Sequence, residues 1–595
     1  MSIKRLLILL LSCLLLACLA LSACGEEETS SEAGSSAEES SEAESSEAES
    51  SGAESSEEES SKGTVSSIVL PEDSSEEESS EAESSEAESS EEESSEAESS
   101  EASNESDESA ESSEDTSEES SEDTSSEEES SEDTSSEVSP DTDPYRDNEG
   151  NFTLNELQMP PFEFADNLFT VLVYGDNLQK TYYSEEIAAG IYGTRIENFV
   201  KLRNRDILAD YGVEIGAYRV DDVAETLRND ALADTVDYDA AMPFLRDAIG
   251  LGQDQLLYNL RNFGDIIHLQ APWWDQTAND TLTFEGKLYF AVGDASFSNK
   301  KASAAVLFNK TLADDLSIDF YAMVRNKTWT LDALYEAGKL LTADIDGTPG
   351  MGFPDTWGVV SSYDIALYHY LASGKQLLTT NTSGVPKVTI GDATGLTTTV
   401  KVIQTLQNTD ALLVVETLSE DGTANWDLGR SVFTSGRALF YVDTLASVDG
   451  LRAGEDVEFG ILPMPLHSSK QQSYSTPVMG QYAYGFCIPR NVANAHFSAY
   501  MMEVLACYSK NTVTPEYEEG LLRSAHTVDW DSREMLEIIF SSMTYDLGVT
   551  HGMGGAGTLL PDMFKDNTTA VASRIYGRIP DIEAAITEYQ KQYRT

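Results

Sequence analysis

The chain has 595 residues and a formal net charge of −71, and this charge is distributed unevenly. Residues 25–140 contain 45 of the 107 acidic residues and a single basic residue, Lys62, so this stretch contributes −44. The remaining body, from residue 141 onward, has 62 acidic and 33 basic residues and contributes −29. Binding to nucleic-acid phosphates depends on clustered Lys and Arg, so this balance argues against nucleic acid as a partner.

Residues 1–23 have the pattern of a secretory signal peptide. Lys4 and Arg5 precede an almost unbroken apolar run at 6–21, and small residues follow it. The string LSACG at 21–25 resembles a bacterial lipobox, which implies cleavage before Cys24 and a diacylglycerol on its thiol, with acyl chains such as palmitate. The alternative is a plain signal peptide with chance cysteines. No later segment reaches about 18 consecutive apolar residues, so we expect a lipid-anchored protein on the extracytoplasmic face of the cell membrane.

Residues 24–145 consist mainly of Ser, Glu and Ala in units such as SSEAE, SSEEE and SSEDT. This composition cannot bury enough apolar surface to offset the entropy of ordering, which predicts a disordered linker. Repulsion between like charges extends such a segment, so we interpret it as a spacer between the membrane and the body. A weak metal-ion sponge is the alternative.

The body, residues 146–595, has the pattern of a two-domain α/β protein, because about 450 residues exceed the usual size of one core. A short β-rich run at 169–174 and an alternating segment at 213–220 predict two strands. Apolar residues at helical spacing from 187 to 200 predict a helix capped by Ser184, and a second helix follows Thr330. Strands that alternate with helices indicate a mainly parallel sheet with helices on both faces.

The two cysteines of the body, Cys487 and Cys507, leave two interpretations open. They could form one disulfide in an oxidising compartment, or they could be buried free thiols. Two cysteines are too few for a scaffold held together by disulfides.

Several strings of the body resemble the extracellular solute-binding proteins of family 1, the carbohydrate-type receptors of bacterial ABC importers. They are EGKLYFAV at 285–292, AVLFNK at 305–310, NKTWTLD at 326–332, FTSGRALF at 433–440 and FGILPMP at 459–465, and a PWWD string at 272–275 is typical of one subgroup. The resemblance implies a two-lobe, type II periplasmic-binding-protein-like fold with a hinge. Lobe 1 would take about 166–295 and 480–520, and lobe 2 about 300–475 and 521–595.

The resemblance also implies the function. We expect a monomeric binding lipoprotein, with no catalysis and no cofactor, that delivers a small solute to the permease subunits of an ABC importer. The solute is expected to be a sugar or an oligosaccharide, although the sequence does not identify it. The alternatives are a cell-surface glycoside hydrolase and a wall-spanning adhesin.

Candidate ligand-binding residues are those that offer flat apolar faces or planar polar groups near the ends of expected strands. They are Trp273, Trp274, Asp443, Trp357, Tyr484, Tyr482, Gln481, Met242 and Pro243. For each of them, core packing is the alternative. Because neighbours in an extended segment point in opposite directions, we expect at most one of the two adjacent tryptophans to face the ligand.

Two loops are reminiscent of ligand loops but lack essential residues. Asp344, Asp346 and Asp355 have calcium-loop spacing, yet a third carboxylate within the loop is missing and Pro349 replaces a flexible glycine. We therefore expect a plain turn and no bound metal. The glycine-rich stretch at 551–557 lacks the Lys and Ser/Thr of a phosphate loop, which predicts a mobile turn.

Overall fold

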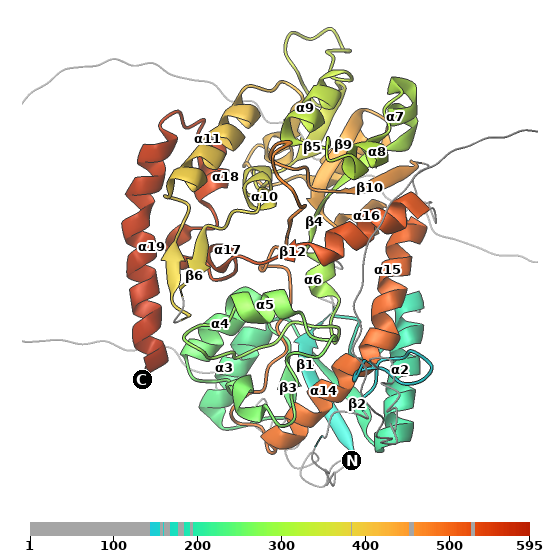
Figure 1. Ribbon diagram of the computed structural model, residues 1–595, viewed down its shortest axis with the longest axis vertical. Helices are drawn as coiled ribbons and strands as arrows, with labels where there is room; N and C mark the ends of the chain where they lie inside the picture. Colours follow the sequence, from blue (N-terminus) through green and yellow to red (C-terminus); the bar gives the residue numbers. More distant parts are fainter. Residues whose placement is uncertain are drawn as a thin grey trace, which may run out of the picture. The chain divides into compact units, whose positions relative to one another are not determined.

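The computed structural model describes residues 143–154, 159, 167–175, 184–190, 194–381, 384–451, 457–524 and 530–594 (Figure 1). They all belong to one compact unit, residues 129–595. The predicted signal peptide, Cys24 and all but the last three residues of the 24–145 linker lie outside the described residues, so those expectations stay predictions. In the described part of the chain, no helix combines the length and the apolar character that crossing a membrane requires.

The first sheet contains three parallel strands in the order β2-β1-β3. They are β1 (Leu168–Tyr174), β2 (Glu214–Val220) and β3 (Ala240–Ala241). Val171 in β1 pairs with Ala217 on one side and Ala240 on the other. Beyond β3, antiparallel bridges join Ala241 to Cys487 and Phe486 to Ala291. The strands predicted at 169–174 and 213–220 are thus confirmed as β1 and β2.

Helices pack around this sheet (Figure 1). They are α2 (Arg195–Tyr211), α3 (Val223–Ala233), α4 (Leu245–Gln253), α5 (Gln276–Thr281) and α14 (Ala495–Asn511). The predicted start of α2 at Ser184 is wrong. The helix begins after Thr194, whose hydroxyl accepts the Glu197 N–H at 3.2 Å, because Thr194 and Glu197 have the spacing of a capping box. The Ser184 hydroxyl donates instead to the Glu186 carboxylate at 3.1 Å.

The second sheet contains five strands in the order β10-β4-β9-β5-β8. They are β4 (Ala304–Asn309), β5 (Trp357–Ser361), β8 (Leu412–Val414), β9 (Ala438–Thr444) and β10 (Phe459–Pro463). The β9-β5-β8 part is parallel, whereas β4 is antiparallel to both of its neighbours, β9 and β10. Because β9 and β10 are both antiparallel to β4, the strands β10, β9, β5 and β8 run in one direction and β4 runs in the other. The expectation of a mainly parallel sheet thus holds for this sheet, with β4 as the exception.

The helix predicted behind Thr330 is confirmed as α9 (Leu331–Lys339). The Thr330 hydroxyl accepts the Ala333 N–H at 3.3 Å, and Leu331, Leu334 and Tyr335 are buried. The other helices that follow β4 are α7 (Lys310–Leu316), α8 (Phe320–Arg325), α10 (Ile365–Ala372), α11 (Ala393–Gln407), α12 (Trp426–Thr434) and α13 (Ser447–Leu451). The short hairpin β6 (Leu378–Thr380) and β7 (Pro386–Val388) lies between α10 and α11 in the chain.

The C-terminal part of the chain is mainly helical. It contains α15 (Val513–Ser524), α16 (Trp530–Ser541), α17 (Leu547–Thr550), α18 (Leu559–Lys565) and α19 (Val571–Arg594). The glycine-rich stretch, expected as a mobile turn, forms a 3-10 turn at Met553–Gly555 that packs against α19. Gly554 has φ 56°, and a Cβ there would lie 2.6 Å from the Asp581 backbone, so this close approach requires glycine.

The chain passes between the two sheets several times, which gives a two-lobe α/β architecture. The first passage includes α6 (Ser298–Lys301), and the second runs from β11 (Thr476–Pro477) towards Phe486, with a bridge between Ser303 and Val478. One continuous core cluster includes Phe169 of β1 and Phe440 of β9. Cys487 and Cys507 are buried free thiols, in agreement with the second of the two interpretations.

Candidate functional site

Three aromatic rings gather at the carboxyl ends of β1 and β3. Tyr174 ends β1, and the centre of its ring lies 4.4 Å from that of Phe244 and 5.6 Å from that of Tyr484. Phe244 and Tyr484 are 5.2 Å apart, so the three rings form one cluster. The three residues are only 3, 6 and 5% exposed, so their rings pack mainly against one another and the core, at the edge where ligands of open α/β sheets bind.

The other residues predicted on this side of the molecule lie beside the cluster. Met242 and Pro243 are buried. Their backbone groups form hydrogen bonds to neighbouring segments: Met242 N–H donates to Leu172 O, and Pro243 O accepts from Gly485 N–H. Tyr482 and Gln481 are partly buried in the turn before Tyr484. The Gln481 Oε1 atom is buried with no hydrogen-bond partner among the described residues, and such an atom usually has a water or a ligand as its partner.

Three carboxyl groups lie at the carboxyl ends of neighbouring parallel strands of the second sheet. Asp443 is near the end of β9, Asp364 follows β5 by three residues, and Glu416 follows β8 by two residues. Burial raises the pKa of Asp443 to about 6 and that of Asp364 to about 6, and it also raises the pKa of Glu416. The nearby Glu416 charge raises the pKa of Asp364 further. Like charges and burial together favour the protonated form of these groups.

These carboxyl groups differ in the number of hydrogen-bond partners that their oxygens have. The Ser447 hydroxyl donates to Asp443, and the Tyr368 hydroxyl lies 3.5 Å from its other oxygen. Glu416 accepts the Tyr363 N–H at 3.2 Å, while its second oxygen is buried and unpaired within the described part of the chain. A protonated carboxyl group donates and a carboxylate accepts, so the cluster can bind hydroxyl groups in either direction.

Of these three acids, the sequence reasoning identified only Asp443. Asp364 and Glu416 were missed because their strands are short and were not predicted. A polar residue directly after a buried strand was the available signal, since the carboxyl ends of parallel strands meet at one edge.

The expectation that Trp273 and Trp274 point in opposite directions is wrong. Their indole N–H groups donate to the two oxygens of the same carboxylate, Glu503, at 3.1 and 2.8 Å. The reason is a turn, in which Trp274 N–H donates to Ala271 O, so the segment is not extended. Trp273 is fully buried, whereas one side of Trp274 lines a cavity of about 180 Å³.

Trp357 does not join the carboxyl edge of the second sheet. It begins β5, whereas Asp364 follows the opposite end of that strand. Its indole N–H donates to Gly352 O at 3.0 Å, and the ring is buried in the core of this sheet. The structure thus places Trp357 among core residues.

The loop with calcium-like spacing brings Asp344, Asp346 and Asp355 together. One carboxylate oxygen of each lies within 4.8 Å of the others. Asp355 accepts the N–H groups of Ile345 and Gly352 at 2.9 and 2.6 Å, and these bonds hold its pKa below the usual range. Both oxygens of Asp355 thus accept backbone hydrogen bonds, and the carboxylates of the exposed Asp344 and Asp346 lie beside it.

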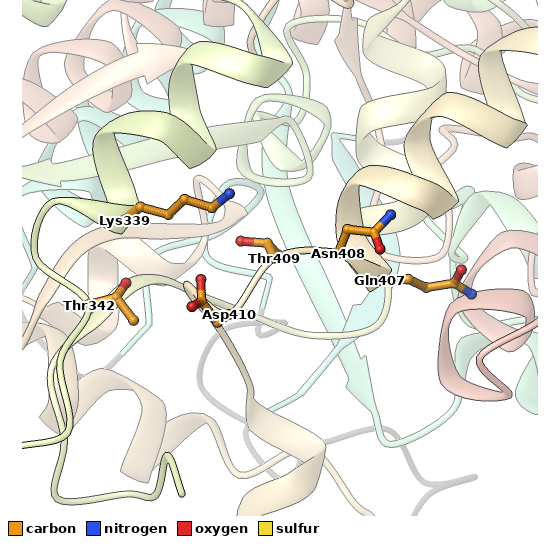
Figure 2. Close-up of a pocket in the computed structure, with 6 residues that line it drawn as sticks. All are labelled: Lys339, Thr342, Gln407, Asn408, Thr409 and Asp410. Atoms are coloured by element: carbon orange, nitrogen blue, oxygen red, sulfur yellow. The ribbon is translucent and has the colours of Figure 1, made fainter.

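A separate polar hollow of about 510 Å³ lies between α9 and the end of α11. Figure 2 shows Lys339 and Thr342 on one side, facing Asn408, Thr409 and Asp410 on the segment after α11. None of the predicted ligand-binding residues lines it. It offers amides and hydroxyls but no aromatic ring, so it is a poor match for the chemistry expected of the solute site.

Comparisons with known proteins find no matching family model and no matching curated protein. Among solved structures, a cyclo/maltodextrin-binding protein complexed with maltotetraose is 14% identical, with 71% of this chain and 98% of that chain covered and a TM-score of 0.48. MalE of Listeria monocytogenes in complex with maltose is 14% identical, with 71% and 98% covered and a TM-score of 0.47. UgpB of Mycobacterium tuberculosis in complex with glycerophosphocholine is 10% identical, with 66% and 95% covered and a TM-score of 0.44.

Two of these structures are described as binding proteins, and all three hold a small ligand. Their identities are below 25% and their TM-scores below 0.5, so the two-lobe architecture rests on the strand pairing and the contacts of this chain itself.

Proposed function

We propose that this chain is a lipid-anchored, extracytoplasmic solute-binding protein that delivers a small hydroxylated solute, a sugar or an oligosaccharide, to an ABC importer. The observation that supports it most is the placement of complementary groups at strand ends. The first sheet ends in the Tyr174, Phe244 and Tyr484 rings, and the second ends in the Asp364, Asp443 and Glu416 carboxyl groups. Rings for C–H faces and carboxyl groups for hydroxyls are together what a sugar requires.

In this proposal four of the predicted residues have a defined role. Tyr484 and Tyr482 offer aromatic surface, Gln481 offers its unpaired carbonyl oxygen, and Asp443 bonds ligand hydroxyls, while Asp364 and Glu416 extend the polar edge. The ligand would be held between the lobes, with lobe 1 at about 166–295 and 480–520 and lobe 2 at about 300–475 and 521–595. Ligand that binds both edges favours the closed arrangement, because only the closed form offers both sets of contacts.

The remaining parts of the proposal concern location and partners. Cys24 would carry the acyl chains, the acidic linker would separate the body from the membrane, and two permease subunits would contact the lobes. The protein would act as a monomer without catalysis. Labelling with a palmitate analogue tests the anchor, since Cys24→Ala should abolish the label and Cys487→Ala should leave it unchanged.

Ligand binding is tested by thermal unfolding of the full chain with a panel of mono- and oligosaccharides. A true ligand at one hundred times its Kd adds about 2.7 kcal/mol to the free energy of unfolding. Asp443→Asn should weaken binding by about tenfold or more, whereas the matched exposed change Asp427→Asn should not. If no sugar stabilises the protein, or if both variants bind equally well, this assignment of the site is wrong.

A second candidate function is that of a surface glycoside hydrolase, because Asp443 and Asp364 are two carboxyl groups with raised pKa values on neighbouring strands. Release of reducing ends from an oligosaccharide, lost in Asp364→Asn, would favour this candidate. Binding without turnover would favour the transport protein.

A further inference from the structure

The described chain begins with a short hairpin, residues 143–154, where the predicted acidic linker meets the body. Arg146 and Phe152 form an antiparallel bridge. The turn between them is closed by Asp147, whose carboxylate accepts the Asn151 N–H at 2.8 Å and the Asn151 side-chain amide at 3.2 Å. This segment therefore has a hydrogen-bonded fold of its own. We call it the entry hairpin.

The entry hairpin is bonded to the end of α14 through one side-chain amide. Asn511 Oδ1 accepts the Phe152 N–H at 2.9 Å, and Asn511 Nδ2 donates to Phe152 O at 2.7 Å. Two strands exchange the same pair of bonds, so here a side chain takes the place of one strand. The helix itself packs on the first sheet, since the centre of the Phe497 ring in α14 lies 5.9 Å from that of Phe169 in β1.

Apolar and cationic contacts add to these two bonds. The Tyr145 ring meets the Trp273 ring edge to face, with 5.7 Å between their centres, and Leu154 is 8% exposed within the main core cluster. The Lys510 ammonium lies 5.8 Å from the centre of the Phe152 ring, within the range of a cation–π interaction. The entry hairpin is thus held by α14 and by a tryptophan that α14 itself bonds.

The position of β1 shows what this attachment does. β1 is the first strand of the body and the central strand of the first sheet, and its Phe169 belongs to the main core cluster. Without the entry hairpin, a pull through the linker would act directly on the amino end of β1. With the hairpin docked, the same pull is borne by the Asn511 bonds and the apolar contacts.

The charge of the linker supplies such a pull. Residues 25–140 carry −44 and the rest of the body −29, so the linker is extended by its own charges and repelled by the body. We infer that the entry hairpin is a tether-docking segment, which joins the linker to α14 and keeps this load from peeling β1 off the first sheet. The role rests on the proposed tether through Cys24 and is independent of the solute.

Hydrogen exchange of the full chain, followed by mass spectrometry, tests the docking. Asn511→Leu removes both bonds to Phe152 and keeps a side chain of similar size, so exchange in peptides covering 145–154 should become about tenfold faster or more. Phe152→Ala should act in the same way from the hairpin side. Asn148→Ala, at an exposed position of the same hairpin, should leave the exchange unchanged. β1 should stay protected in all three variants.

Magnetic tweezers test the load. Handles are attached to the full chain through azidophenylalanine at Ser139, just before the hairpin, and at Leu208, which is 47% exposed on α2. Undocking should appear as a separate first step of up to about 80 Å, because the 24 residues at 143–166 then extend at 3.3–3.6 Å each. Asn511→Leu and Phe152→Ala should lower the force of this step and leave that of the later unfolding of the sheet unchanged.

Three results would overturn the inference. One is exchange in 145–154 that is as fast in the unaltered protein as in Asn511→Leu. Another is a single step in which the hairpin and the sheet give way together. The third is a first step whose force neither variant lowers. A missing palmitate label on Cys24 would instead contradict the proposed anchor, which neither exchange nor pulling measures.

Discussion

At the scale of single residues, Glu503 shows how one buried carboxylate positions two tryptophans. It is fully buried, it accepts both indole N–H groups, and the His268 ring lies 3.3 Å from it. The hydrogen bond to Glu503 raises the pKa of His268 against the opposing effect of burial. A carboxylate has no donor of its own, so it suits a site where two indole N–H groups meet.

Glu503→Gln is therefore expected to destabilise the protein although it conserves shape. The amide places an NH₂ group against one indole N–H and leaves a buried donor unpaired, at a cost of about 1–3 kcal/mol. Urea unfolding measures the change. The control is the exposed Glu537→Gln, which should remain within about 0.5 kcal/mol of the unaltered protein. Equal stability of the two variants would show that the indole contacts contribute little.

Asp364 gives a pH dependence that can be checked. Burial raises its pKa to about 6 in the folded protein, and none of the described residues donates a hydrogen bond to its carboxyl group. Because the folded state binds this proton more tightly than the unfolded chain, Asp364 contributes stability that is fully present below about pH 4 and is lost as the pH rises through about 6.

Asp364→Asn should thus flatten the fall in the free energy of unfolding between about pH 4 and pH 6. Urea titrations at several pH values measure this slope. The exposed Asp427→Asn serves as the control and should keep the slope of the unaltered protein. A slope unchanged in Asp364→Asn would contradict a raised pKa at this position.

At the scale of elements, α9 packs directly on β5 through two glycines. A Cβ at Gly358 would lie 2.5 Å from the Gly338 backbone, so the helix and the strand approach more closely than any side chain permits. The contrast is Gly577 in α19, where an added Cβ would meet nothing within 4 Å.

The two glycines predict opposite effects of the same substitution. Gly358→Ala should destabilise the protein by about 1–3 kcal/mol, because backbone atoms would have to move apart. Gly577→Ala should stabilise it by about 0.5–1 kcal/mol, because alanine lowers the entropy cost of the helix. Both values come from denaturant midpoints, and a stabilising Gly358→Ala would show that α9 can shift on β5.

At the scale of the whole molecule, one core cluster spans both sheets, and a second cluster contains other residues of the second sheet. The cluster that contains Phe169 of the first sheet also contains Phe440 of the second and Met535 of α16. Several passages of the chain connect the halves, and Tyr545 ties them through its hydrogen bond to Asp275 at 2.6 Å. Separate unfolding of one half would expose apolar surface of the other.

We therefore expect a single cooperative unfolding transition for the body. Calorimetry of the full chain should give one peak whose calorimetric and van't Hoff enthalpies agree. Fluorescence and circular dichroism should report the same urea midpoint. Two resolved peaks would show that the lobes unfold independently despite the shared cluster.

Much of the local structure followed from the sequence, and particular elements explain the limits. Strand β1 was predictable because it is a short β-rich run that ends at Gly175, β2 because its residues alternate, and α9 because Thr330 precedes a regular apolar stripe. The start of α2 was missed because Ser184 and Thr194 are both plausible caps, and only the latter has Glu three residues later. Asp364 and Glu416 were missed because β5 and β8 are short.

The sequence by itself determined the α/β class, several strands and helices, and the chemical type of the candidate site residues, because periodicity, capping and composition act over a few neighbouring residues. Only the tertiary structure decided which of those residues meet. Trp273 and Trp274 turn to one carboxylate, Trp357 stays in the core, and Asp443 joins two acids that lie 79 and 27 residues away in the chain. The reason is that strand order and turn geometry, which arise from packing over long distances in the chain, set the position of each side chain.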